Sequence, residues 1–252
     1  MPGAGLNGTL GTFAGKTFLD RCLTYMSTQL EIRETQGAEV EPSPSGPAVT
    51  ISYQAGSGAH DIAIRLADLL SARAQPKSVP WTVFDRQLVE KALADHNMSQ
   101  SLAKFIPEDR QSALRQAMDT MFGVIPSAWD MVPIIAETVL NLADAGHVIL
   151  VGRGANFITT TRPNVFHVRL MGSLQRRIQR VQEREQLTLE MATKSVTEED
   201  RARGRYVKTH FGQGIEDELF YHLVINTDRV SLDVAAGLIS DGARRCFPGI
   251  FP

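Results

Sequence analysis

Residues 48–63, AVTISYQAGSGAHDIA, form the stretch that decides the fold. The run begins with β-branched residues at positions 49–51, which favour a buried strand. A glycine-serine turn follows, and apolar residues then recur at helical spacing over residues 62–70. A strand, a glycine-rich turn and a helix in this order favour anion binding, because the backbone bends close to a ligand and the first N–H groups of the helix point at it. The stretch therefore predicts a phosphate site, and a nucleotide is the expected ligand.

The turn is a degenerate Walker A phosphate loop. In the motif G-x-x-x-x-G-K-[ST], the lysine reaches the terminal phosphates and the hydroxyl group binds magnesium. Gly58 can serve as the second glycine, but Tyr53 stands where the first should be. Ala59 replaces the lysine, and His60 replaces the hydroxyl residue. On this motif alone, phosphate binding and an ordinary strand-to-helix turn are both open interpretations.

The amino-acid composition limits the classes of protein to which the chain can belong. The 252 residues are 43% hydrophobic and 21% charged, which suffices for one α/β domain with a sizeable core. The net charge of −2 argues against a nucleic-acid surface, and no apolar run approaches the roughly 18 residues that span a bilayer. The two cysteines, Cys22 and Cys246, and the histidines have no spacing typical of a metal site or a disulfide framework. We expect no metal-protein site, no membrane partner and a cytoplasmic location.

The chain divides into a tail and a main domain. Residues 1–47 are expected to hold one amphipathic helix, within 17–34, and a Pro/Ser/Gly linker at 42–47. The helix could dock on the core, join two copies of the chain or bind a partner protein. Residues 48–252 are expected to form the main domain.

Strand and helix patterns alternate along the main domain. Further strands are predicted at residues 81–84, 147–151, 165–170 and 222–226, and helices within 86–145 and at 174–184, 188–211 and 229–243. This alternation implies a parallel sheet, whose ligands bind at the carboxyl ends of the strands. The segments expected at that edge are Gly56 to Gly58, Asp85 with Arg86, and Gly152 to Gly154.

Several charged residues are candidates for ligand binding, each with a structural alternative. Arg153 emerges between two glycines after a strand, and could instead cap or salt-bridge the sheet. Asp200 and Arg203 could form a lid or a solvated i, i+3 pair. Asp85 could bind an acceptor or cap the next helix, and His60 could be an exposed first-turn residue. The basic helix could be a solvated face; its arginines are Arg176, Arg177, Arg180 and Arg184.

Together these features resemble the nucleoside monophosphate kinases of the P-loop class, most closely the cytidylate kinase-like family. The resemblance covers roughly residues 48–243. Its carriers are Ile51-Ser52 with Gly56-Ser57-Gly58 and Ile62-Ala63, Phe84-Asp85-Arg86, Val151-Gly152-Arg153-Gly154-Ala155, Asp200 with Arg203 and Tyr206, and Ile225-Asn226-Thr227. It implies a three-layer P-loop NTPase fold with a parallel five-stranded sheet, a helical acceptor-side insert at 86–145 and a helical lid at about 176–212.

The resemblance also implies an activity. Such kinases transfer the terminal phosphoryl group of ATP, with Mg²⁺, to a nucleoside monophosphate such as CMP or to a related small phosphorylated acceptor. Positioning and positive charge do most of this work, and arginine suits it by its permanent charge and bidentate geometry. The implied catalytic residues are Arg153, Arg203 and Asp200. The implied donor site is Gly56, Ser57, Gly58, Ala59 and His60, and the implied acceptor site is Asp85, Arg86, Arg153, Arg180 and Arg184.

The sequence departs from cytidylate kinases proper at several positions. Ala59 stands for the lysine, and Val151 and Gly154 stand where aspartates flank the glycine-arginine pair. Members of the cytidylate kinase-like group often lack the lysine too. His60 stands where that group commonly has arginine. Two further hypotheses therefore stay open: a non-catalytic nucleotide sensor or scaffold, and a kinase for a phosphorylated acceptor other than a nucleotide.

Overall fold

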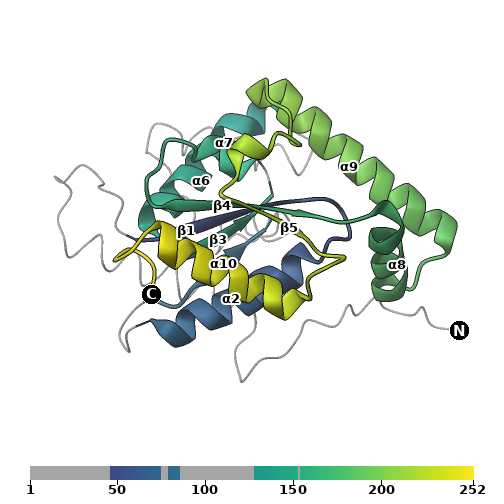
Figure 1. Cartoon of the computed structure of the whole chain (residues 1–252). Coiled ribbons are helices and arrows are strands. Elements are labelled where there is room, and N and C mark those ends of the chain that lie inside the picture. Colours follow the sequence, from purple (N-terminus) through teal and green to yellow (C-terminus); the bar gives the residue numbers. More distant parts are fainter. Residues whose placement is uncertain (1–45, 75–78, 86–127, 153) are drawn as a thin grey trace, which may run out of the picture.

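The structure is a computed structural model that describes residues 46–74, 79–85, 128–152 and 154–252 (Figure 1). The expected N-terminal helix lies outside the described residues, as does the expected insert up to residue 127. Two of the predicted site residues, Arg86 and Arg153, also lie outside them.

Five parallel strands form one sheet in the order β2-β3-β1-β4-β5. The strands are β1 (Ala48–Tyr53), β2 (Thr82–Phe84), β3 (Val148–Val151), β4 (Val165–Met171) and β5 (Leu223–Asn226). The predicted five-stranded parallel sheet is confirmed, and the bounds of the last four strands differ from the predicted ones by at most one residue. The central strand β1 lies between β3 and β4, so its carboxyl end, where the glycine-rich turn begins, is at the middle of the sheet.

Helices cover both faces of the sheet (Figure 1). One face is covered by α2 (Ala59–Arg73) and α10 (Leu232–Cys246), and the other by α6 (Ala128–Ala145) and α7 (Ala155–Ile158). Alternate residues of β1 and β4 enter the apolar core with α2 and α10; they include Val49, Ile51, Phe166, Val168 and Leu170. Because strand side chains alternate, the opposite face of these two strands carries other residues. Besides Ala48 and Val165, this face carries four buried polar residues: Thr50, Ser52, His167 and Arg169.

The predicted lid is a pair of helices, α8 (Leu174–Glu185) and α9 (Leu189–Phe211), followed by the short helix η1 (Glu218–Phe220). The hydroxyl oxygens of Ser173 and Thr188 accept hydrogen bonds from first-turn N–H groups and so cap α8 and α9. Apolar residues of both helices pack against Ala55, at the start of the glycine-rich turn. In Figure 1, α9 runs from the end of the sheet where α8 lies to the side of α7.

Two described residues precede the expected start of the main domain at residue 48. Gly46 and Pro47 are both buried. The Asn164 side-chain amide donates to the Gly46 carbonyl oxygen at 2.6 Å, and the His147 N–H donates to that of Pro47 at 2.6 Å. Both residues therefore pack against the main domain. None of the described helices combines the length and apolar character that crossing a bilayer requires.

Candidate functional site

The glycine-rich turn connects β1 to α2, and it has a backbone that only glycine adopts readily. Gly56 and Gly58 have φ angles of 77° and 84°. A Cβ atom on Gly56 would lie 2.4 Å from the carbonyl oxygen of Arg177, and one on Gly58 would lie 2.7 Å from a methyl carbon of Leu232. Gly56 is therefore restricted to glycine by conformation and by space, and Gly58 by conformation, since the Leu232 side chain can move.

The turn presents unused backbone donors. The Ser57 N–H donates to the Gln54 carbonyl oxygen at 3.1 Å, but the N–H groups of Gly56, Gly58 and Ala59 bond to no other described residue. The Ser57 hydroxyl is fully buried and likewise has no hydrogen-bond partner in the described chain. Unused N–H groups at the start of α2, with the helix dipole behind them, favour an anion such as a phosphate group.

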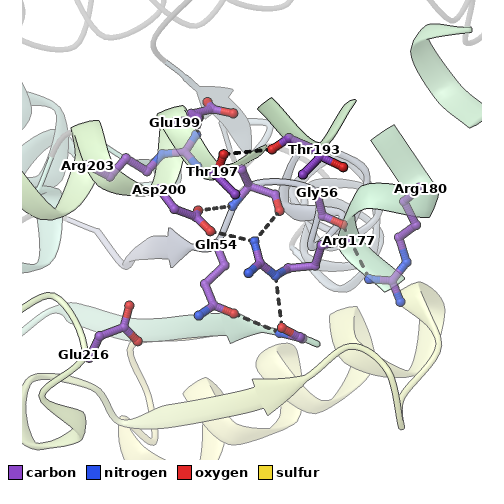
Figure 2. Close-up of polar contacts among 12 residues, drawn as sticks. Gln54, Gly56, Arg177, Arg180, Thr193, Thr197, Glu199, Asp200, Arg203 and Glu216 are labelled. Carbon is purple, nitrogen blue, oxygen red and sulfur yellow. Dashed lines mark hydrogen bonds and ion pairs between the residues drawn. The ribbon is translucent and has the colours of Figure 1, made fainter. Parts of the chain in front are cut away.

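A lock of three residues, Ala55, Arg177 and Asp200, holds this loop to the lid helices (Figure 2). The Ala55 N–H donates to one carboxylate oxygen of Asp200 at 2.7 Å, and the Arg177 guanidinium donates to the other at 2.6 Å. Arg177 also donates to the carbonyl oxygens of Ala55 and Gly172, each at 2.9 Å, and it is only 5% exposed. Asp200 thus joins the lid to the first residue of the turn.

Arg180 and Arg184, both predicted to bind the acceptor, have different surroundings. Arg180 donates to the side-chain and backbone oxygens of Thr227, and it lies 3.8 Å from the Asp228 carboxylate. The hydrogen bond from Ser173, followed by the positive charge of Arg180, holds the pKa of Asp228 below its usual range. Arg184 is exposed and pairs with Glu185, whereas Arg180 also donates to the Gly56 carbonyl oxygen of the phosphate loop at 3.5 Å.

A pocket of about 250 Å³ lies at the carboxyl ends of β1 and β3. Its lining residues are Ser52, Tyr53, Val151, Gly152, Gly154, Asn156, Glu199, Ala202, Arg203, Tyr206, Val207 and Ile215. Gly152 and Gly154 flank Arg153, so the glycine-arginine turn predicted to contact the acceptor borders this pocket.

Arg203 supplies the positive charge of the pocket wall. Its guanidinium carbon lies 3.7 Å from the centroid of the Tyr53 ring, a cation–π contact, and one of its nitrogens donates to Glu199 at 2.5 Å. Its other terminal nitrogen is buried and has no partner in the described chain. Burial raises the pKa of the Tyr53 phenol in spite of the nearby arginine, so the phenol stays neutral at physiological pH. The pocket therefore offers an unused charged donor to an anionic ligand.

His60 and Asp85, two predicted site residues far apart in sequence, are brought together. An imidazole nitrogen of His60 lies 3.1 Å from a carboxylate oxygen of Asp85. The hydrogen bond that His60 donates to the Asp85 carboxylate raises the pKa of His60, so the imidazole is protonated for more of the time at neutral pH than a free histidine would be. This pair puts a titratable positive charge in the first turn of α2, beside Ala59.

Sequence reasoning gave Arg169 no role and considered Arg177 only as one arginine of the basic helix. Arg177 lies four residues before Val181, on the buried stripe of α8, and that spacing was the available signal. Arg169 is a charged residue inside an apolar strand and is 4% exposed. A charge at such a position needs a partner, which is itself a signal of function or of a buried ion pair.

The residues present fit a nucleoside triphosphate better than they fit a tightly held metal ion. No group of three or more potential metal-ligating side chains occurs in the part of the chain that the structure describes. Magnesium in kinases is held largely by substrate phosphates, water and one or two carboxylates. Asp61, in the first turn of α2, and Asp85, after β2, are two acidic residues near the phosphate loop.

Comparison with known proteins agrees with this geometry. The model of the cytidylate kinase-like family matches residues 48–229. A crystal structure of an uncharacterized protein from Eubacterium ventriosum ATCC 27560 is similar, with a TM-score of 0.56 and 20% identity over 80% of this chain and 99% of that one. That of TT1252 from Thermus thermophilus has a TM-score of 0.38 and 16% identity over 79% of this chain and 97% of that one.

No curated protein sequence matches the chain. The structural likeness at 20% identity supports the fold alone. The family match spans most of the chain, including the phosphate loop, the glycine-arginine turn and the Asp200–Arg203 segment. The chain therefore belongs to the cytidylate kinase-like family, and it has the nucleotide kinase-like fold of that family.

Proposed function

We propose that the protein transfers the terminal phosphoryl group of ATP to a nucleoside monophosphate resembling CMP, or to a related small phosphorylated acceptor. One observation carries this proposal. A phosphate loop with unused N–H groups ends the same strand that contributes Ser52 and Tyr53 to the Arg203 pocket. An anion on the loop and an anionic acceptor in the pocket would lie at the same edge of the sheet, as transfer between them requires.

The residues divide into donor and acceptor sides. The backbone from Gly56 to Ala59 would hold the donor phosphates, with the charge of His60 next to it. Arg203 would contact the acceptor, together with Arg153 from the bordering turn. Magnesium bound to the donor phosphates would neutralise charge that builds up during transfer. Because phosphoryl transfer needs little covalent help, this arrangement of N–H groups and arginines is the kind of machinery the reaction uses.

Specific contacts favour a second candidate, a nucleotide sensor or scaffold without turnover. Ala59 leaves the loop without the lysine that reaches the terminal phosphates. Two arginines of α8 next to the loop, Arg177 and Arg180, already donate to protein oxygens. Fewer cations are then available to stabilise the transferred group. The cytoplasmic location, and an oligomer or partner contact through residues 17–34, stay predictions under either candidate.

A substrate panel separates the two candidates. ATP, magnesium and each nucleoside monophosphate in turn would be incubated with the full chain, with ADP and the diphosphate product measured by chromatography. Turnover of one acceptor is the expected result. Nucleotide binding, seen as a rise in melting temperature, without any product would support the sensor instead.

Matched arginine variants test the pocket. We expect Arg203→Ala and Arg153→Ala each to lower kcat/KM for the acceptor about ten- to a hundredfold, since each removes a charge-assisted contact. Arg205, on the exposed side of the same helix as Arg203, is the control. Arg205→Ala should leave kcat/KM near the wild-type value. Equal effects of Arg203→Ala and Arg205→Ala would contradict a pocket role for Arg203.

A further inference from the structure

A buried arginine lies directly behind the wall of the Arg203 pocket. Arg169, on β4, is 4% exposed, and its guanidinium donates to the Ser52 hydroxyl oxygen at 2.9 Å and to the Glu216 carboxylate at 2.8 Å. Its third nitrogen, Nε, has no partner in the described chain. Removing a guanidinium from water costs several kcal/mol unless it is fully paired. Glu216 is 66% exposed and screened by water, so it offsets that cost only in part.

The same strands already contain a polar pair that avoids this cost. Thr50 and His167 face each other across β1 and β4, one pleat before Ser52 and Arg169, and they share a hydrogen bond of 2.8 Å. Burial lowers the pKa of His167 to about 4, so this pair is uncharged at neutral pH. A neutral pair satisfies this face of the sheet. A charged residue is therefore not needed to satisfy this face of the sheet, and Arg169 has another role.

The hydrogen bonds around Ser52 fix the direction in which its proton points. Arg169 can only donate, so the Ser52 oxygen accepts from it. The Tyr221 hydroxyl donates to the Ile215 carbonyl oxygen at 2.9 Å, and burial raises its pKa, so it keeps its proton. The Tyr221 oxygen lies 3.3 Å from the Ser52 oxygen, which is long for a bond between two hydroxyl groups. The Ser52 hydroxyl proton thus makes only a weak hydrogen bond inside the protein, and Ser52 lines the pocket.

We propose that Ser52 donates its hydroxyl proton to an oxygen of the anionic acceptor, and that Arg169 is the positioning residue that fixes this direction. The inference rests on the proposed function, because it assigns a specificity contact to the same pocket. It also narrows the ligand. The group that meets Ser52 must accept a hydrogen bond, as a phosphate oxygen or a base carbonyl does, and an analogue with an N–H donor at that place should bind poorly.

Acceptor kinetics and binding of four variants test the proposal: Ser52→Ala, Arg169→Met, the double variant and Arg169→Lys. CMP is the probe, its dissociation constant measured by calorimetry on the full chain, alongside KM and kcat for the acceptor and for ATP. We expect each of the first two variants to weaken acceptor binding about three- to tenfold, with KM for ATP unchanged. If Arg169 acts through Ser52, the double variant should be no weaker than the weaker single variant.

Arg169→Lys and one further variant, Thr50→Val, separate positioning from folding. Arg169→Lys keeps the charge and one donor, so it should recover part of the lost affinity, and it remains a test if Arg169→Met fails to fold. Thr50→Val is the matched control, because it removes a buried hydroxyl from the same strand and face away from the pocket. It should lower stability and leave acceptor binding unchanged.

The outcomes distinguish this inference from the proposed function. CMP binding that is equal in wild type and Ser52→Ala would overturn the inference while leaving the kinase proposal intact. Additive losses in the double variant would overturn the positioning role of Arg169. Wild-type protein that binds neither CMP nor any other acceptor of the panel would overturn the proposed function and this inference with it.

Discussion

Asp200 has both carboxylate oxygens committed inside the protein. One accepts from the Ala55 N–H and the other from the guanidinium of Arg177. A carboxylate in this position repels a phosphate group, but it can hold the loop that binds one. These contacts support a positioning role for Asp200, in which the lid helix sets the direction of the loop.

Asp200→Ala should therefore destabilise the protein and also weaken ATP binding. Removing the carboxylate leaves Arg177 as a buried charge without its counterion, at a cost of about 3 kcal/mol. Urea unfolding measures the loss, and a titration with ATP should show weaker binding because the loop is no longer held. Glu198→Ala, an exposed change on the same helix, should cost no more than about 0.5 kcal/mol. An unchanged unfolding midpoint for Asp200→Ala would contradict the lock.

At the scale of elements, sequence periodicity predicts what depends on neighbours in the chain. The alternation of strand and helix patterns is enough to predict the five strands, α8 and α9, because burial imposes these periods locally. Periodicity cannot predict the hydrogen bond between Ala55 and Asp200, because these residues are 145 positions apart and meet only after folding. The helix α7 has four residues, too few for a periodic pattern. The strand β4 was predicted, but the partners of its charged residue Arg169 were not.

The phosphate loop shows how closely these elements fit together, and two glycine variants test it. In Gly56→Ala, the new methyl group would meet the backbone of α8 at 2.4 Å and the residue would keep a left-handed φ of 77°. Since the contact atom is a backbone oxygen that cannot turn away, we expect a loss of at least about 2 kcal/mol. At Gly204, inside α9, an added methyl group would have no neighbouring atom within 4 Å.

Gly204→Ala should raise the free energy of unfolding by about 1 kcal/mol, the usual gain for alanine over glycine inside a helix. Thermal and urea unfolding of both variants measure the contrast. A Gly56→Ala protein as stable as wild type would mean that the loop and α8 can separate at little cost. In that case, the close contact would not hold the loop in place.

At the scale of the whole molecule, histidines set opposite pH limits on stability. Burial lowers the pKa values of His147, His167 and His222, whereas the hydrogen bond to the Asp85 carboxylate raises that of His60. A buried neutral histidine binds its proton more readily in the unfolded chain, so its contribution to stability falls as the pH falls. His60 binds its proton more readily in the folded chain, so its contribution falls as the pH rises through its raised pKa.

The strongest of these effects comes from His167, which packs against His222 and bonds to Thr50. Its pKa is about 4 in the folded protein and about 6.5 when unfolded, so between these two pH values the unfolded chain holds more protons. Over that window the free energy of unfolding should decrease by roughly 3 kcal/mol on acidification because of this residue alone.

Urea unfolding from pH 7.5 to 4 of wild type and His167→Gln isolates the effect, since the carboxylates titrate equally in both. The decrease in the free energy of unfolding on acidification should be smaller in His167→Gln than in wild type. His60→Gln should keep this decrease and lose only the decline in stability above pH 6.5. An equal decrease in the free energy of unfolding on acidification in wild type and His167→Gln would mean that the folded protein accommodates a protonated His167 on this face of the sheet.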